Sequence, residues 1–202
     1  QKQHDKVESF DKQWLPSDQY SKFEILVLTG SLSRAKVEPS ALAEDDLPKL
    51  RRFLQGGGTM IVTPAAMEIF RLPPAMEFLE SIIGKHTRDT RAKAPNKVLD
   101  PSQPWAKPLA GQDLSWLDKR SILLCSDKGQ PIIGTGDGRS ILARWPVDKG
   151  LLIYVGWNFS DFLPNGRNLK STPEEETRYE SQYQVLDHLA ADLSQPHGPS
   201  GK

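Results

Sequence analysis

Two short runs of consecutive apolar residues stand out in the first third of the chain. They cover residues 25–28 (Ile-Leu-Val-Leu) and 60–62 (Met-Ile-Val). An uninterrupted apolar run of this length is typical of a strand that is buried on both faces, as in the centre of a parallel sheet. We therefore predict that these two runs form neighbouring core strands.

A helical pattern separates the two runs. Acidic residues at 44–46 begin it and glycines at 56–58 end it, as the helix dipole and the C-terminal cap favour. A second helix is predicted between Pro74 and Gly84. The apolar positions of the two helices recur at intervals of three and four residues, and they are Leu47, Leu50, Phe53, Leu54, Phe78, Leu79, Ile82 and Ile83.

The second half of the chain changes in character, because short apolar segments alternate with turn residues. The segments cover 122–125, 131–133, 140–145 and 151–155, and the turns are centred on residues 127–129, 137–138 and 148–150. Closely spaced turns favour antiparallel pairing. We expect segments 140–145 and 151–155 to form a hairpin at one edge of the sheet. A last helix is predicted after Thr172, with an apolar stripe at Tyr179, Tyr183, Leu186, Leu189, Ala190 and Leu193.

These patterns predict a three-layer α/β domain over residues 14–193, with a mostly parallel central sheet and an antiparallel hairpin extension. A polar N-terminal segment, residues 1–13, precedes the domain, and residues 7–10 within it have the length of a short edge strand. Residues 194–202 are disordered by composition. Residues 85–108 are irregular, basic and rich in proline, and we predict a long loop there.

Composition excludes several classes of protein. Lys+Arg and Asp+Glu number 26 each, so the formal net charge is zero and no long-range field favours nucleic acid. No apolar run approaches the ~18 residues of a membrane-spanning helix. The polar start of the chain does not resemble a signal peptide. Cys125 is the single cysteine, which excludes an internal disulfide and a cysteine-rich zinc site.

No reactive side chain stands at the position where α/β enzymes commonly carry one. In α/β enzymes the chemistry commonly follows a core strand, and here residues 60–62 are followed by Thr63-Pro64-Ala65-Ala66. The glycines at 56–58 follow a helix and precede a strand, which is the reverse of a phosphate-binding loop and favours a helix cap. The spacing Gly134-x-Gly136-x-Gly138 favours a hairpin, because a strand and not a helix follows it.

Cysteine and histidine give weak support for catalysis. Cys125 ends an apolar run, where a buried structural cysteine is the commoner interpretation. His86 follows the predicted second helix and is the histidine best placed for catalysis, although a surface histidine is the simpler interpretation. No two of the four histidines have the spacing of metal ligands, so we predict no metal and no cofactor.

Two segments are candidates for binding. Basic residues cluster between 85 and 97, as a solvated loop or an anion contact. An aromatic segment at 157–162 follows the last strand, where it either lines a pocket for a sugar or peptide or covers the sheet edge. We take Trp105, Trp157, Asn158, Phe159, Asp161 and His86 as candidate binding residues.

Three segments carry a resemblance to a known superfamily. They are LPSDQYSKFEILVLTG, DLPKLRRFLQGGGTMIVTPA and GRSILARWPVDKGLLIYVGWNFSDF. Together they resemble the class I glutamine amidotransferase-like superfamily and, within it, the trehalose-utilisation (ThuA-like) group. The resemblance covers roughly residues 14–162 and implies a flavodoxin-like fold. It also implies placement in a larger extracytoplasmic bacterial protein, in the periplasm or outside the cell.

Two departures from the superfamily shape the functional expectation. The nucleophile elbow is missing, because Thr63-Pro64-Ala65 stands where the superfamily has a cysteine between glycines. A further strand and helix that such domains carry before the Val7 region are also missing. We therefore expect a non-catalytic binding or assembly domain, with a protein partner, an N-terminal extension or a second copy at the open sheet edge. The alternative for that edge is that residues 1–13 fold back and cover it. The alternative is a carbohydrate-related hydrolase or isomerase of the ThuA-like kind, which would gather His86, Glu68 or Asp161 in one pocket.

Overall fold

The computed structural model places an α/β domain around one mixed sheet of eight strands. It describes residues 17–28, 44–89, 94–103, 106–117, 121–157 and three residues of the last helix, Asp187, Leu189 and Ala191. The strands are β1 Ile25–Leu28, β2 Thr59–Val62, β3 His86–Asp89, β4 Lys97–Val98, β5 Leu123–Ser126, β6 Gln130–Gly134, β7 Arg139–Val147 and β8 Gly150–Val155.

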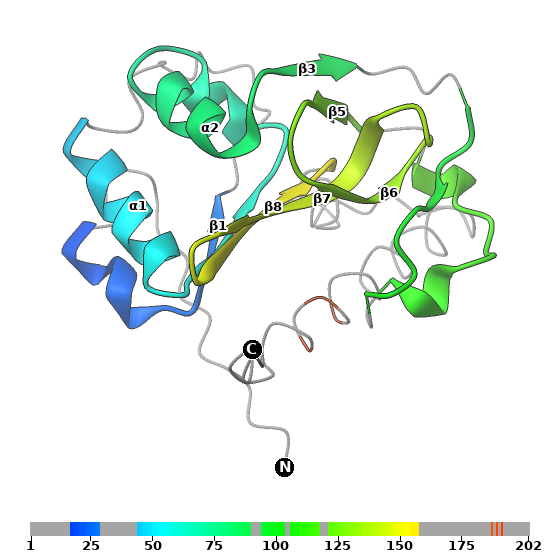
Figure 1. Cartoon of the computed structure of the whole chain (residues 1–202), viewed down its shortest axis with the longest axis horizontal. Coiled ribbons are helices and arrows are strands. Elements are labelled where there is room, and N and C mark those ends of the chain that lie inside the picture. The colour runs from blue at the N-terminus through cyan, green and yellow to red at the C-terminus, as the bar shows by residue number, and fades with distance from the viewer. Residues whose placement is uncertain are drawn as a thin grey trace, which may run out of the picture.

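Helices connect these strands. The α-helices are α1 Leu47–Gln55 and α2 Ala75–Ile83, and the short 3₁₀ helices are η1 Ser17–Lys22, η2 Glu44–Asp46, η3 Ala66–Phe70, η4 Lys107–Leu109 and η5 Ser115–Leu117. Figure 1 shows α1 and α2 together on one side of the sheet. No helix in the described part of the chain is long and apolar enough to cross a bilayer.

The sheet follows the order β1-β2-β8-β7-β5-β3, with β6 pairing with β7 and β4 with β6. Strands β1, β2 and β8 are parallel neighbours, which confirms the predicted pairing of β1 with β2. β2 is buried on both faces, whereas β1 ends the described sheet instead of lying in its centre. The predicted β7–β8 hairpin forms and extends this parallel part, but β5 and β6 also pair with β7, so the hairpin lies within the sheet and not at its edge. The remaining described pairings are antiparallel, so the antiparallel part is larger than the predicted hairpin.

The predicted loop at 85–108 contains a strand that the sequence pattern did not reveal. Residues 86–89 form β3, which pairs antiparallel with β5. Their sequence, His-Thr-Arg-Asp, is entirely polar, and charged edge strands of this kind carry no apolar alternation that marks a strand. The expectation of an irregular loop is therefore wrong for these four residues, and it is also wrong for Lys97 and Val98, which form β4 and pair with β6.

Apolar side chains pack on both faces of the sheet, since successive residues of a strand point to opposite faces. Met60 and Val62 of β2 and Tyr154 of β8 face α1 and α2, whereas Ile61 and Ile153 join the other cluster. That second cluster is closed by η4, η5 and the last helix, through Leu109, Leu114, Leu117 and Leu189.

The predicted end of α1 is confirmed, and glycine is required where α1, β2 and β8 converge. Gly57 has a φ of 108°, which lies in the region that favours glycine. Gly150 begins β8, and a Cβ placed on it would lie 2.1 Å from the carbonyl oxygen of Leu54 and 2.4 Å from that of Gly58. This close approach brings the helix end against both strands.

Truncation of Leu54 tests this packing. Leu54 has no exposed surface, and the Leu54→Ala variant leaves a cavity between α1 and the sheet. We expect the free energy of unfolding to fall by about 2–5 kcal/mol. Urea denaturation followed by circular dichroism measures it, and Gln55→Ala is the matched control because Gln55 is exposed. Equal losses in the two variants would contradict the described packing.

Candidate functional site

The carboxyl ends of the three parallel strands define one edge of the sheet. Thr63 follows β2 and Gly156 follows β8 at this edge. Because β7 runs antiparallel to β8, its first residue, Arg139, lies there too. Strand β5 pairs with β7 and β3 with β5, so Asp89 at the end of β3 reaches the same edge. We name Thr63, Glu68, Arg88, Asp89, Asp137 and Arg139 the carboxyl-edge cluster.

The hydroxyl of Thr63 is used structurally. Thr63 is fully buried, and its Oγ1 donates to the carbonyl oxygen of Leu28 at 3.3 Å. The same oxygen accepts a bond from the amide of Ala66 at 3.4 Å, in the first turn of η3. This side chain therefore joins the end of β2 to β1 and to the first residue of η3. Pro64, Ala65 and Ala66 follow Thr63 at the end of β2.

Glu68 is held by two arginines on the side of the sheet that α1 and α2 cover. Its Oε1 accepts a bond from Arg88 Nη1 at 2.6 Å, and its Oε2 lies 3.4 Å from Arg71 Nη1. Arg88 lies opposite Leu124 in the β3–β5 pair, so it shares the face of Leu124. Tyr154 belongs to the same cluster as Leu124, and burial raises the pKa of its hydroxyl well above the ordinary value.

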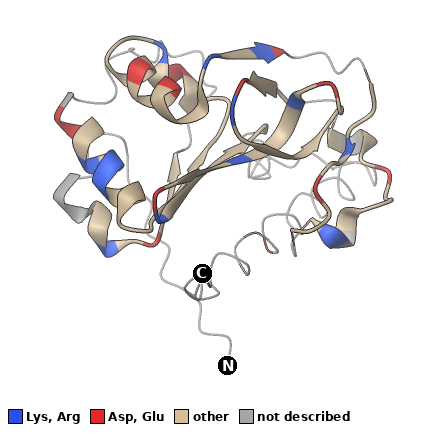
Figure 2. Ribbon diagram, viewed as in Figure 1, with Lys and Arg blue, Asp and Glu red and all other residues tan. Residues whose placement is uncertain are grey.

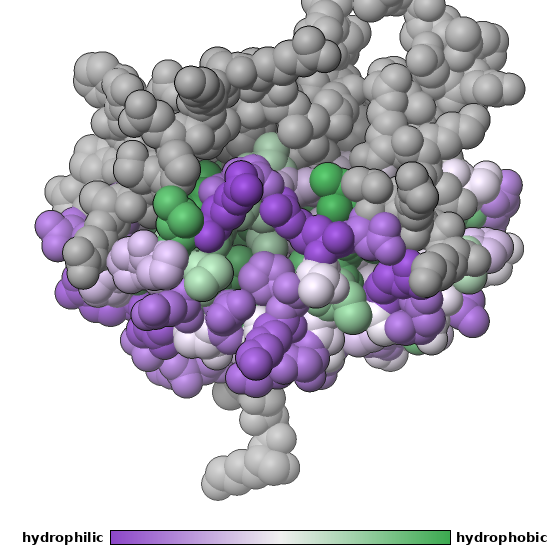
Figure 3. Space-filling view, turned by 90° about the horizontal axis from the view of Figure 1, so that it is seen from above, coloured by the Kyte–Doolittle hydropathy of each residue, from purple (hydrophilic) through white to green (hydrophobic). Residues whose placement is uncertain are grey.

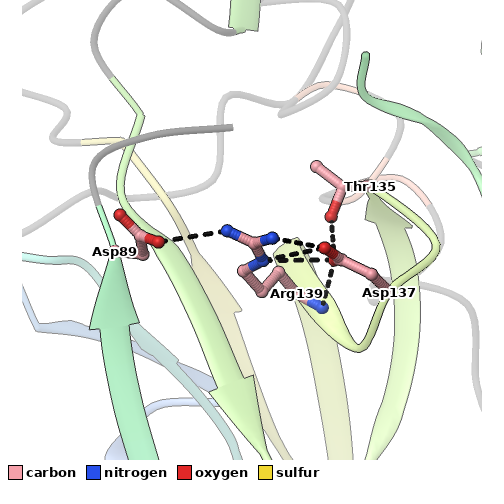
Figure 4. Close-up of polar contacts among 4 residues, drawn as sticks. All are labelled: Asp89, Thr135, Asp137 and Arg139. Atoms are coloured by element: carbon pink, nitrogen blue, oxygen red, sulfur yellow. Dashed lines mark hydrogen bonds and ion pairs between the residues drawn. The ribbon is translucent and has the colours of Figure 1, made fainter. Parts of the chain in front are cut away.

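Arg139 holds two aspartates on the opposite side of the sheet (Figure 4). Its Nη1 donates to Asp89 Oδ2 at 3.0 Å, and its Nε donates to Asp137 Oδ2 at 3.0 Å. The Arg139 Nη2 and the Thr135 hydroxyl also donate to Asp137. The guanidinium joins β3 to the turn between β6 and β7, and its side chain is 13% exposed.

The Arg139 side chain lowers the pKa of the Asp137 carboxyl far below its ordinary value, and the hydroxyl of Thr135 adds to this effect. Asp137 in turn raises the pKa of the Arg139 guanidinium. Hydrogen bonds to a charged carboxylate stabilise that form, so Asp137 remains ionised in the ordinary pH range. Such a group is a poor proton donor and a poor base.

The charges of this edge are compensated locally. Figure 2 shows acidic and basic residues dispersed over the described helices and turns, while the β1, β2 and β8 ribbons are uncharged. From above, a band of hydrophilic residues crosses the described surface, with hydrophobic residues showing beside it (Figure 3).

Among the described residues, no three His, Cys, Asp or Glu side chains are grouped to hold a metal ion.

A shallow groove of ≈ 420 Å³ lies elsewhere, between α1 and the start of α2. Its lining residues are Leu47, Pro48, Arg51, Pro74, Glu77 and Phe78. Arg51 lies 5.3 Å from the centre of the Phe78 ring and donates to Ser81 Oγ at 2.9 Å. Arg51 and Glu77 supply the charged side chains of this groove, and the carboxyl-edge cluster contributes no side chain to it.

Two of the six candidate binding residues lie in the described part of the chain. Trp157 is 1% exposed and packs in the core, so the structure places it inside the protein and not on an exposed aromatic surface. Its indole N–H has no hydrogen-bond partner among the described residues. Trp105, Asn158, Phe159 and Asp161 lie outside the described residues.

His86 begins β3, opposite Ser126, three residues before Asp89. Its Nδ1 is buried without a hydrogen-bond partner in the part of the chain that the structure describes, so no described carboxylate is bonded to that nitrogen. Glu68 is bonded instead to Arg88, on the same strand as His86. Glu68 is thus paired with the arginine two residues after His86.

Sequence reasoning missed Asp89, Asp137 and Arg139 as a group. Asp137 stood out only as part of the Asp137-Gly138 turn, which the structure confirms between β6 and β7. An Asp two residues before an Arg at a hairpin end is a usable signal for a local ion pair. The contact to Asp89 spans fifty residues of sequence, and no local pattern indicates it.

Comparison with known proteins gives no family and no curated relative, because no family profile and no curated protein matches the chain. Solved structures are similar at low identity. The cytoplasmic protein STM3548 from Salmonella typhimurium has 11% identity and a TM-score of 0.48, with 89% of this chain and 75% of that chain covered.

Two glycosidases are also similar in structure. The exo-beta-1,4-mannosidase Op5Man5 from Opitutaceae bacterium strain TAV5 has 12% identity and a TM-score of 0.37, with 86% of this chain and 25% of that chain covered. The beta-galactosidase from Bacillus circulans sp. alkalophilus has 14% identity and a TM-score of 0.41, with 84% and 23% covered. This chain thus spans about a quarter of each glycosidase, and no function follows from similarity at this level.

Replacement of Arg139 by Gln tests the electrostatics of the edge. We expect the pKa of the Asp137 carboxyl to rise towards its ordinary value, as followed by carboxyl ¹³C NMR during acid titration. In the wild type, the pKa of the Asp137 carboxyl is depressed in the folded state. The charged carboxylate therefore stabilises the fold fully above the ordinary aspartate pKa of about 3.9, and this stabilisation is lost as the pH falls further. The stability difference between wild type and variant should therefore shrink in acid. An unchanged Asp137 titration would contradict the described pairing.

Proposed function

We propose that this chain is a non-catalytic binding or assembly domain of a larger protein. The observation that supports this most is the state of the carboxyl-edge cluster. Glu68, Asp89 and Asp137 each accept a bond from an arginine, and the Thr63 hydroxyl bonds to the backbone. The described side chains at the usual place for α/β chemistry are thus engaged with one another.

The finer fold assignment belongs to the same proposal. A three-layer, flavodoxin-like architecture is supported by the apolar clusters on both faces of the sheet and by the parallel β1-β2-β8 core. Membership in the class I glutamine amidotransferase-like superfamily rests on the sequence resemblance. The same is true of an extracytoplasmic bacterial location.

The competing proposal is a carbohydrate-related hydrolase or isomerase. It requires a general acid and base that face a common cleft, within hydrogen-bond reach of a substrate. Glu68 is engaged by Arg88 and Arg71, and the described groove is lined by other residues. These contacts favour the binding domain.

Direct assays distinguish the two proposals. The purified chain is incubated with glutamine, with release of ammonia as the readout, and separately with aryl glycosides, with release of the phenol as the readout. We expect no turnover above buffer in either assay, because Glu68, Asp89 and Asp137 are each paired with an arginine at the edge where α/β chemistry usually lies. Cys125→Ser and Glu68→Gln are the control variants. Turnover that either substitution abolishes would contradict the proposal.

A further inference from the structure

The two ends of the β1-β2-β8-β7-β5-β3 path through the described sheet differ in how they are protected. β3 ends the sheet on one side and carries His86, Arg88 and Asp89, and charge is a common protection of an edge strand. β1 ends it on the other side, and its sequence is Ile-Leu-Val-Leu. It contains no charge, proline or bulge. This composition is typical of a central strand, although β1 pairs only with β2 among the described residues.

The backbone of β1 shows which groups face outwards. The carbonyl of Glu24 accepts a bond from the Thr59 amide at 2.9 Å, and the carbonyl of Leu28 accepts one from the Thr63 amide at 3.3 Å. In a strand, the N–H and C=O of one residue point to the same side, and the side alternates along the chain. Leu26 therefore faces β2, whereas the N–H and C=O of Ile25 and Val27 face away from it.

The side chain of Val27 is exposed on the same strand. It is 46% exposed, and Leu72 is the other exposed large hydrophobic residue of the described chain. Ile25 packs against the cluster that η4 and η5 close, and Val27 shares that face because it lies two residues further on. An exposed apolar side chain thus stands beside outward backbone donors and acceptors.

We propose that β1 pairs antiparallel with β1 of a second copy of this chain, with Leu26 opposite Leu26 of that copy. The proposal deepens the proposed assembly function and rests on it. In this register Ile25 of one copy lies opposite Val27 of the other, and each of these two residue pairs exchanges two N–H···O=C bonds, so the strand pair forms four hydrogen bonds. The two sheets become one continuous sheet across a two-fold axis.

Side-chain direction restricts the register. Two residues that lie opposite each other in an antiparallel pair point to the same face of the sheet. A shift of the register by one residue would place Leu26 opposite Val27, and this is excluded because the two side chains point to different faces. Centring the pair on Leu26 satisfies this condition and sets the exposed Val27 against Ile25. It also uses all the outward groups of the four-residue strand.

Charge favours a second copy of the chain as the occupant. The formal net charge of zero leaves no repulsion between copies, and proteins near zero net charge associate readily. β1 itself has no charged residue that would select a partner of opposite sign. A pair of four-residue strands buries far less than the ~1,600 Å² of a standard interface, so we expect a weak dimer that forms at high concentration.

Sedimentation velocity over a wide concentration range tests the association. We expect the 22.6 kDa chain to shift towards a dimer as its concentration rises. Val27→Lys should abolish the shift, because it places two ammonium groups at the strand pair. Leu72→Lys is the matched control and should leave the shift unchanged, since Leu72 is similarly exposed but lies outside β1. Circular dichroism checks that both variants are folded.

Disulfide trapping tests the register. Ile25→Cys and Val27→Cys are prepared separately in a Cys125→Ser background and then mixed under mild oxidation. Opposed residues of a hydrogen-bonded pair have Cα atoms about 5.5 Å apart, within the range of a disulfide. We expect the mixture to give the 25–27 cross-linked dimer by mass spectrometry, and each variant alone to remain uncross-linked.

Three results would overturn the inference. They are a monomer at every concentration, a dimer that Val27→Lys does not weaken, and cross-linking of Val27→Cys with itself in preference to the mixture. A monomer without turnover in the ammonia and glycoside assays would reject the self-pairing and leave the proposed binding role intact. Turnover in those assays would reject that role, whatever the state of association.

Discussion

The structure depends on the burial of β2 between two parallel neighbours. All four residues of β2 are buried, and its register places Met60 beside Leu26 and Leu152. Met60 and Val62 pack under α1 and α2, while Ile61 packs into the second cluster. A strand buried on both faces must satisfy its backbone through neighbouring strands. This requirement fixes β1 and β8 on either side of β2 and directs their carboxyl ends to one edge.

The placement of charge at that edge follows from the same arrangement. Charged side chains at the ends of β3 and β7 find partners on other elements of the fold. Arg88 and Asp89 are adjacent in β3 and point to opposite faces. One meets Glu68 of η3, and the other meets Arg139 of β7. These contacts join β3 to both sides of the sheet, which gives the cluster a structural role.

Local sequence patterns predicted the elements that are apolar and regular. The runs at Ile25–Leu28 and 60–62, the stripe of α1 and the glycines after Gln55 each carry a signal that tertiary contacts reinforce. Strand β3 was missed because His86-Thr87-Arg88-Asp89 has no apolar alternation, and its pairing with β5 depends on residues far away in sequence. Trp157 shows how far a sequence pattern can predict a candidate binding residue. An aromatic residue after a strand fits a pocket or a core equally well, and only the packing of Ile61, Val155 and Leu117 in the same cluster places it in the core.

Native-state hydrogen exchange by NMR tests the central place of β2 most directly. Amides in the middle of a sheet exchange through the least frequent openings, whereas edge strands open more readily. We predict the slowest exchange at Met60, Ile61 and Val62 and along β8, and faster exchange at Thr87 and Arg88 of β3. Exchange in β2 that is as fast as in β3 would contradict the described sheet order and the geometry of the carboxyl edge derived from it.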